Sequence, residues 1–228
     1  MRFELIWQYL PRLLEGAALS VQLVIVSGAI GLLLAIPLAL GRISRNPLIA
    51  AGPYAYIFFF RGTPLLVQLF LVYYGLAQFT FIRESVLWPI LRDPYWCAVI
   101  TMALHTAGYI AEILRGAIQA VPGGEIEATR ALGMSRLTAL RRIILPRAVQ
   151  IAWPAYGNEV ILMLKGSALA STITLLELTG MARTIIAKTY TPVEIFMAAG
   201  AIYLLLSFVM VQGFRLIERR LNRHLVRV

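Results

Sequence analysis

The chain has 228 residues, of which 60% are hydrophobic and only 14% are charged. This composition excludes an ordinary soluble domain and predicts an all-α protein with several membrane-spanning helices. The length suits a single transmembrane domain over residues 1–228, with short loops and no separate soluble domain. The formal net charge of +10 does not require a nucleic acid, because basic residues beside apolar runs serve membrane topology and bind anionic lipid.

The first two predicted spans differ in how clearly their limits can be read. No charged residue lies between Glu15 and Arg42, so a helix over Gly16–Gly41 is long enough to cross the membrane as span 1. The N-terminus shows no short apolar region that ends at a small-residue cleavage site, so we expect this first apolar run to be retained. Span 2 is predicted over residues 63–81, with residues 48–60 as its lead-in or as an interfacial helix.

Three further spans are predicted downstream. Residues 94–111 are uncharged and form span 3, which carries His105. Span 4 covers residues 148–164 and is followed by a break or a short outer helix at residues 166–174, then by a mixed polar stretch. Span 5 covers residues 195–214. We therefore expect a polytopic protein with about five transmembrane helices.

Basic and charge-balanced segments alternate between these spans. The turn with Arg42 and Arg45, the interval of residues 121–148 and the C-terminal tail with Arg223 and Arg227 are basic, whereas the remaining connecting segments are balanced. Because cytoplasmic loops carry an excess of Lys and Arg, we expect the N-terminus outside and the C-terminus inside the cell. The 121–148 interval then lies in the cytosol.

The 121–148 interval is the longest polar stretch of the chain. A Pro-Gly-Gly turn opens it, Glu125 suits the start of a helix, and Gly133 interrupts the helical pattern. Ser135 can cap a second short helix, which Pro146 is expected to end. We predict two short helices outside the bilayer, an element that can act only by touching something in the aqueous phase.

The interval resembles the EAA loop of ABC importer permeases. The resemblance rests on Glu127-Ala128, Gly133 and Leu145-Pro146 at the spacing of that loop. It implies that this loop docks into a groove on the ATP-hydrolysing subunit, through Glu125, Glu127, Ala128, Gly133, Leu145 and Pro146. Thr129 replaces the third residue of the signature but adds little volume, so docking should survive. An ordinary cytosolic helical hairpin is the alternative interpretation of the loop by itself.

The resemblance extends over nearly the whole chain. Residues 60–68, 73–75 and 158–165 resemble the polar amino acid branch of these permeases, especially the M-type subunits of histidine/lysine/arginine/ornithine and octopine/nopaline systems, and residues 93–97 lean to the opine side. This implies a type I ABC importer permease fold in a bacterial inner membrane and a basic amino acid or opine as substrate. It also implies a sister permease or a second copy, two ATP-binding cassette subunits and a periplasmic solute-binding protein.

Glu159 lies well inside span 4, about 16 Å from its start. An ionisable group at this depth costs several kcal/mol unless it faces a partner or a wet cavity. It is either a carboxylate that attracts a cationic substrate, with Asn158 beside it to orient it, or a structural acceptor for a neighbouring helix. Lys165 lies on another helix face, so it is not a natural partner for Glu159 and should snorkel outward or meet a second subunit.

Two further features are candidates for the substrate pathway. Arg61-Gly62-Thr63-Pro64 implies irregular backbone, which at membrane depth is tolerated only where it is buried in protein or lines a cavity. Arg61 and Thr63 are therefore candidate pathway residues, although an Arg at the head-group level that starts span 2 is the simpler alternative. His105 is either a hydrogen-bonded packing residue or a proton relay.

The sequence shows no catalytic triad, no metal-ligand spacing and no phosphate-cradling glycine loop. We therefore expect no cofactor on this chain, and ATP must be bound by another subunit. The predicted function is that of a permease subunit of an ATP-driven importer. The alternative is an ion-coupled carrier or channel that acts alone, although such carriers usually show internal repeats and several paired intramembrane charges.

Overall fold

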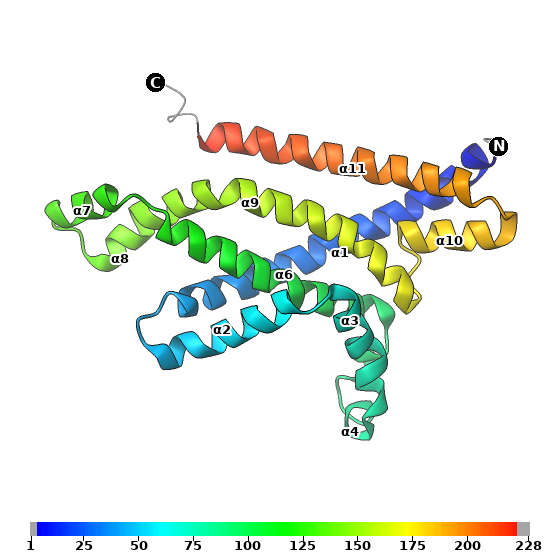
Figure 1. Ribbon diagram of the computed structural model, residues 1–228, viewed down its shortest axis with the longest axis horizontal. Coiled ribbons are helices and arrows are strands. Elements are labelled where there is room, and N and C mark those ends of the chain that lie inside the picture. Colours follow the sequence, from blue (N-terminus) through cyan, green and yellow to red (C-terminus); the bar gives the residue numbers. More distant parts are fainter. Residues whose placement is uncertain (1–3, 223–228) are drawn as a thin grey trace.

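The computed structural model describes residues 4–222, which form an elongated helical bundle (Figure 1). The longer helices are α1 (Glu4–Arg42), α2 (Pro47–Gly62), α6 (Pro94–Gln119), α9 (Leu145–Gly166), α10 (Leu178–Thr189) and α11 (Pro192–Leu221). The short segments are α3 (Leu65–Phe70), η1 (Leu71–Gly75), η2 (Leu76–Gln78), α4 (Thr80–Arg83), α5 (Trp88–Leu91), α7 (Gly123–Ala131), α8 (Arg136–Ala139), η3 (Leu140–Ile144) and η4 (Ser167–Ile173). All elements in this range are helical, which confirms the all-α class. Arg223 and Arg227 of the predicted basic tail lie outside the described residues.

The number of candidate spans agrees with the prediction. Within residues 4–222, α1, α6 and α11 are each long and apolar enough to cross a membrane. Two bent helix pairs pass the same test, residues 47–78 with a bend of 102° and residues 136–189 with a bend of 48°, which brings the number to as many as 5. α1 begins before the predicted Gly16 and continues through Pro11 and Pro37.

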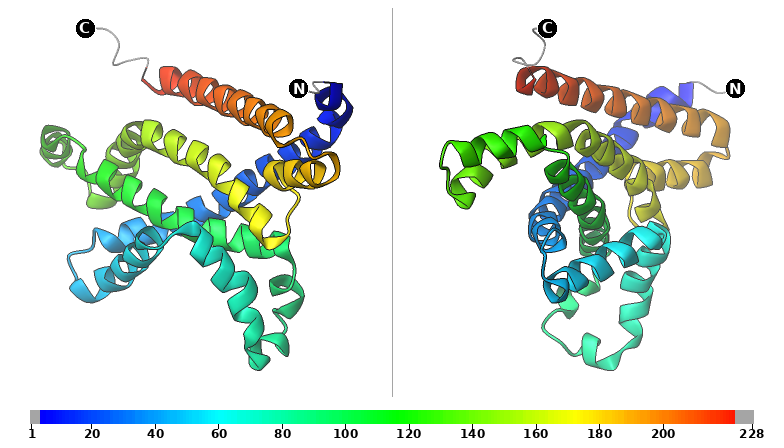
Figure 2. Two further views of the ribbon diagram at one scale, coloured as in Figure 1. Left: turned by 45° about the vertical axis from the view of Figure 1, so that its right-hand side comes forward. Right: turned by 60° about the vertical axis from the view of Figure 1, so that its left-hand side comes forward.

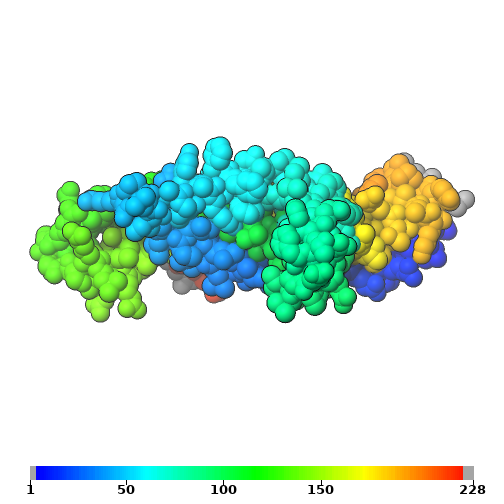
Figure 3. All heavy atoms as spheres, turned by 90° about the horizontal axis from the view of Figure 1, so that it is seen from below, coloured from blue at the N-terminus to red at the C-terminus, as the bar shows by residue number. Residues whose placement is uncertain are grey.

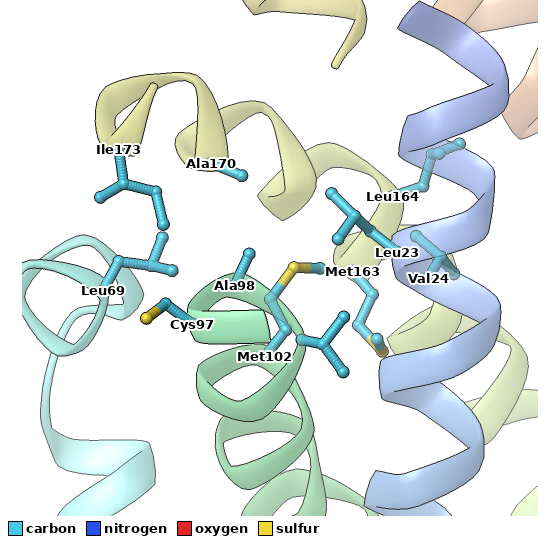
Figure 4. Close-up of a cluster of buried hydrophobic side chains, with 11 residues drawn as sticks. Leu23, Val24, Leu69, Cys97, Ala98, Met102, Met163, Leu164, Ala170 and Ile173 are labelled. Atoms are coloured by element: carbon cyan, nitrogen blue, oxygen red, sulfur yellow. The ribbon is translucent and has the colours of Figure 1, made fainter. Parts of the chain in front are cut away.

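The bundle is organised around α6, which packs along α1 and α9. Small residues permit this approach, since a Cβ on Gly31 of α1 would clash with the methyl group of Thr106 on α6. Close packing of this kind holds helices together in lipid, where the hydrophobic effect between them is absent. Figure 4 shows the apolar cluster at the centre, which includes Leu23, Leu69, Met102, Met163 and Ile173.

The region of span 2 differs from the prediction of one helix over residues 63–81. The regular helix is α2, which covers the predicted lead-in or interfacial helix of residues 48–60 and runs through Pro53 without a break. Thr63 is extended (φ −116°, ψ 142°), because the ring of Pro64 disfavours the helical region for the residue before it. The chain then turns by 102°. α3 still packs on α6, and the segment from η1 to α5 then leaves the bundle as a side arm, which Figure 2 shows from two directions.

The predicted pair of short helices is present in the 121–148 interval. α7 is followed by Gly133, whose φ of +68° favours glycine, and Ser135 caps α8 by accepting a hydrogen bond from the Thr138 N–H at 3.2 Å. The expectation that Pro146 ends the second helix is wrong. The chain continues from α8 through the π-turn η3 into α9, and Pro146 lies in the first turn of α9. A proline is tolerated there because the wider π-turn before it alters the hydrogen-bond register.

The two ends of the molecule carry different elements. The α7–α8 tip forms one end, and α10 with the beginning of α1 forms the other (Figure 3). The break predicted at residues 166–174 is the 3₁₀ segment η4, after which Thr174 adopts a left-handed conformation (φ 73°). The mixed polar stretch that follows contains α10, whose first turn is capped by the side chain of Glu177.

Candidate functional site

Glu159 lies on the side of α9 that faces α6, and only 7% of its surface is exposed. Its Oε1 accepts a hydrogen bond from the hydroxyl of the fully buried Thr106 at 3.0 Å. Glu159 is therefore an acceptor for a neighbouring helix, as one of the two predicted roles requires. The Glu159 carboxylate accepts only this one hydrogen bond from Thr106. Most of the lone pairs on the carboxylate oxygens therefore remain available to another donor.

A cavity of about 150 Å³ adjoins Glu159 at the junction of α3, α6 and α9. It is lined by Leu65, Met102, His105, Tyr109, Glu159, Leu162 and Met163. Apolar walls with a few polar groups are the usual construction of a ligand site. The volume matches a side-chain head group rather than a whole amino acid. The arrangement can hold a small group that carries hydrogen-bond donors on an apolar stem.

A second cavity, of about 400 Å³, lies between α1, α6 and the first half of α9. Its walls are aliphatic and aromatic side chains, among them Ile36, Leu145 and Trp153, and no carboxylate lines it. The Trp153 N–H donates to the Phe214 carbonyl oxygen at 3.0 Å. The larger cavity therefore lacks the chemistry that would recognise a polar substrate, and the smaller cavity beside Glu159 is the better candidate.

Gln68 joins His105 to the bend after α2. Its amide nitrogen donates to the Phe60 and Thr63 carbonyl oxygens, each at 3.1 Å, and to the Thr63 hydroxyl at 2.7 Å. Its amide oxygen lies 3.1 Å from Nδ1 of His105. Sequence reasoning missed Gln68, although a Gln four positions after a Pro within an apolar run was a usable signal. Thr63 reaches the cavity wall only through this residue.

The other predicted pathway residues lie elsewhere. Asn158 and Lys165 are exposed. The guanidinium of Arg61 lies 5.3 Å from the ring centroid of Tyr109, and Arg61 lines a separate cavity of about 280 Å³ with Glu112 among its walls. The structure thus brings His105 and Glu159 to one cavity, and it does not bring Asn158, Lys165 or Arg61 to that cavity.

The 121–148 loop presents most of its predicted coupling residues outward. Glu127, Ala128, Gly133 and Pro146 are exposed, and Leu145 is half-buried. Glu125 forms an ion pair with Arg147 at 3.2 Å, which ties α7 to the start of α9. Thr129 is buried, and its hydroxyl donates to the Ile126 carbonyl oxygen at 2.7 Å. The extra hydroxyl is therefore satisfied within the loop and does not alter the exposed face.

Two leucines of the same loop were missed by sequence reasoning. Leu132 and Leu137 flank Gly133 and are 74% and 65% exposed. Both stand in an interval rich in charged residues, where isolated leucines were a usable signal. An exposed apolar pair with a polar rim is typical of a protein interaction site.

Residues 28–223 match the profile of the family described as binding-protein-dependent transport system inner membrane component. The chain belongs to this family. It is an inner-membrane permease of a binding-protein-dependent transport system, which confirms the resemblance found in its polar loop.

Curated relatives cover nearly the full length of this permease. It is 52% identical over 213 residues to the octopine transport system permease protein OccM of Rhizobium meliloti, with 93% of this chain and 87% of the relative covered. It is 47% identical to the nopaline transport system permease protein NocM of Agrobacterium fabrum, with 99% and 94% covered. It is 43% identical to the histidine/lysine/arginine/ornithine transport system permease protein HisM of Salmonella typhimurium, with 97% of each chain covered.

Solved structures confirm the ABC importer permease fold. A chain in the crystal structure of an amino acid ABC transporter with histidines matches this permease with a TM-score of 0.87 and 35% identity, covering 96% of this chain and 99% of the other. A chain of the MetNI methionine ABC transporter in an inward-facing conformation has a TM-score of 0.75 at 19% identity, over 94% and 98% of the two chains. The second likeness concerns the fold alone.

Proposed function

We propose that this permease imports basic amino acids or opines, and that ATP bound and hydrolysed by separate subunits drives the import. The observation that carries the proposal is the Glu159 carboxylate at the wall of an apolar cavity. The names of its relatives, which refer to octopine, nopaline and basic amino acids, support the substrate class. Octopine and the basic amino acids share a cationic side chain on a flexible apolar stem.

Glu159 forms no ion pair within residues 4–222, and the charge of Arg61 acts on it from beyond ion-pair distance. A charge buried away from water is costly unless it is paired or meets a wet cavity. A guanidinium or ammonium group in the adjoining cavity supplies the missing partner, with the Leu65, Leu162 and Met163 side chains around its stem. Glu159 is then the counter-charge for substrates during their passage.

The 121–148 loop is the coupling element, and it docks on the ATP-hydrolysing subunit through Glu127, Ala128 and Gly133, with Leu132 and Leu137 as apolar anchors. Two features of the structure support this role. The Glu125–Arg147 ion pair joins α7 to α9, and the chain is helical without interruption from α8 to Gly166. A displacement of the docked tip therefore moves α9 and the Glu159 carboxylate with it.

This arrangement requires an N-terminus outside and a C-terminus inside the cell, with one permease domain over residues 1–228 and the loop in the cytosol. The pore forms with a sister permease or a second copy of this chain. Two ATP-binding cassette subunits lie on the cytosolic side, and a periplasmic solute-binding protein delivers the substrate. The chain itself binds no cofactor.

The test is ATP-driven uptake of radiolabelled arginine and octopine by vesicles that hold the complete transporter. Glu159→Gln should lower uptake of both substrates at least about 30-fold, which corresponds to about 2 kcal/mol for an unpaired charge. Glu84→Gln, at an exposed carboxylate in the side arm, is the matched control. Normal uptake by Glu159→Gln, with its ATPase subunits bound, would remove Glu159 from the pathway.

The coupling role has its own test. Gly133→Ala places a side chain at a φ of +68°, and Leu132→Ser removes an exposed anchor. Each should lower co-purification of the ATPase subunits and ATP-driven uptake together, while the permease still assembles. Uptake that continues without ATP would instead favour a carrier acting alone.

A further inference from the structure

The orientation of the Gln68 amide is decided by its surroundings. Its nitrogen has the Phe60 and Thr63 carbonyl oxygens and the Thr63 hydroxyl within hydrogen-bond distance. The Thr63 hydroxyl donates its own hydrogen to the Phe59 carbonyl oxygen at 2.8 Å, so it can only accept from Gln68. A reversed amide would place its oxygen against these acceptors, which is repulsive. The amide oxygen therefore faces His105.

This orientation decides the tautomer of His105. The Gln68 oxygen accepts at 3.1 Å from Nδ1, so Nδ1 carries the hydrogen. In a neutral imidazole the other nitrogen, Nε2, then carries a lone pair. Nε2 makes no hydrogen bond within the described part of the chain, and His105 lines the cavity beside Glu159. The cavity wall thus presents two acceptors, the carboxylate and the imidazole lone pair.

We propose that Gln68 is a positioning residue for substrate preference, because its hydrogen bond to His105 keeps Nε2 an acceptor beside Glu159. The proposal rests on the proposed passage of substrate past Glu159. Two acceptors on the wall of one cavity suit a guanidinium, which offers only N–H donors in a fixed fork. They disfavour a urea group of the same shape, whose carbonyl oxygen would face a lone pair. Arginine and citrulline are the probes: they share a skeleton, but citrulline has a carbonyl oxygen in place of one guanidinium nitrogen and lacks the positive charge. Glu159 responds to the charge with or without Gln68, so the change in preference between the wild type and a Gln68 variant reports on the imidazole acceptor.

The first measurement is the tautomer itself, by solid-state NMR of nitrogen-15-labelled histidine in the assembled transporter. The chain has 2 histidines, so a His224→Gln background leaves His105 as the source of its imidazole signal. The other subunits are left unlabelled. The wild type should show a protonated Nδ1 and an unprotonated Nε2. A proton on Nε2 in the wild type would overturn the proposal.

Variants at Gln68 separate positioning from packing. Gln68→Met is close in shape but replaces the amide oxygen with a weakly accepting thioether, so the proton should move wholly or partly to Nε2. Gln78→Met, at an exposed glutamine of the side arm, should leave the spectrum unchanged. An unchanged tautomer in Gln68→Met would overturn the proposal.

The second measurement is equilibrium binding of arginine and citrulline to the membrane complex without its binding protein. Gln68→Met should reduce the preference for arginine about tenfold, because a donor then faces the substrate in place of an acceptor. His105→Phe, which removes the lone pair and keeps a ring, should reduce it similarly. If Gln68→Met does not assemble, His105→Phe and the wild-type spectrum together decide the outcome. An unchanged preference in His105→Phe would overturn the proposal.

Failure of this proposal can be told apart from failure of the proposed function. If Glu159→Gln leaves arginine affinity unchanged, the pathway past Glu159 is wrong, and with it the role in substrate preference, whatever the tautomer. If Glu159→Gln lowers the affinity but Gln68→Met changes neither tautomer nor preference, the pathway stands and the role of Gln68 is wrong.

Discussion

Two buried carboxylates of this permease, Glu159 and Glu177, have opposite surroundings. Glu177 is completely buried and caps α10, accepting from the backbone N–H groups of Thr179 and Gly180 at 3.0 and 2.9 Å. It also accepts from the hydroxyls of Ser20 on α1 and Tyr203 on α11, at 3.2 and 2.8 Å. Glu159 accepts from Thr106 at 3.0 Å and borders a cavity.

The difference shows how a structural carboxylate is distinguished from a candidate binding group. The oxygens of Glu177 are saturated with donors from three helices and have no access to a ligand. Those of Glu159 keep unused acceptor capacity and face open volume. Burial alone does not separate the two, whereas the number of donors and the adjoining space do.

The largest expected effect on stability is that of Glu177→Gln. The amide NH₂ group would face N–H and O–H donors, and unsatisfied buried donors cost about 1–3 kcal/mol each, so we expect a loss of about 3 kcal/mol. Glu159→Gln is the matched substitution and should cost less than about 0.5 kcal/mol, because the Thr106 hydroxyl can donate to the amide oxygen. Unfolding of the purified complex in detergent measures the loss of stability in each of the two variants. Equal losses would erase the distinction between the two sites.

The next effect is expected at the glycine that lets α1 approach Thr106. Gly31→Ala would push a Cβ into the Thr106 methyl group, and overpacking of this kind costs about 1–3 kcal/mol. Because Thr106 holds Glu159, arginine affinity should fall as well. Gly28→Ala is the control on the same helix, since its Cβ would meet Met163 at 3.8 Å, an ordinary contact. We expect the unfolding midpoint of the complex to fall in Gly31→Ala and to stay unchanged in Gly28→Ala.

Tyr203→Phe tests whether Glu177 is a structural carboxylate. It removes one donor to the carboxylate and should destabilise the complex by about 1 kcal/mol without changing arginine affinity. Tyr190→Phe is the control, because Tyr190 is 86% exposed. A change in substrate binding with unchanged stability would place Glu177 in the pathway and contradict its structural role.

The smallest effect concerns the orientation of Glu159. Thr106→Val removes its hydrogen-bond donor and should lower arginine affinity about threefold, since the carboxylate gains rotational freedom. Asn158→Ala should leave the affinity unchanged, because Asn158 is exposed and does not line the cavity. Binding titrations on the two variants decide which neighbour orients Glu159. An effect of Asn158→Ala alone would restore the role expected from the sequence.

The backbone turn after α2 shows the limit of local patterns. Residues 63–81 were predicted to form one span, yet the chain turns by 102° at Pro64 and the regular helix lies upstream. The prediction at Pro146 was wrong in the opposite sense. Pro146 was expected to end a helix, and it instead lies in the first turn of α9. A proline removes one N–H and restricts its predecessor, but whether the chain bends depends on what replaces that hydrogen bond.

The sequence by itself determined the class of this protein, because apolar runs, charge bias and motif spacing are local properties. It also singled out Glu159, since a charge within an apolar run is costly wherever the helix packs. Only the tertiary structure decided the roles of the buried polar groups. Gln68 and His105 are 37 positions apart, and Ser20 and Glu177 are 157 apart. Which of these distant residues become hydrogen-bond partners depends on which helices lie side by side, because these hydrogen bonds and cavities form between helices.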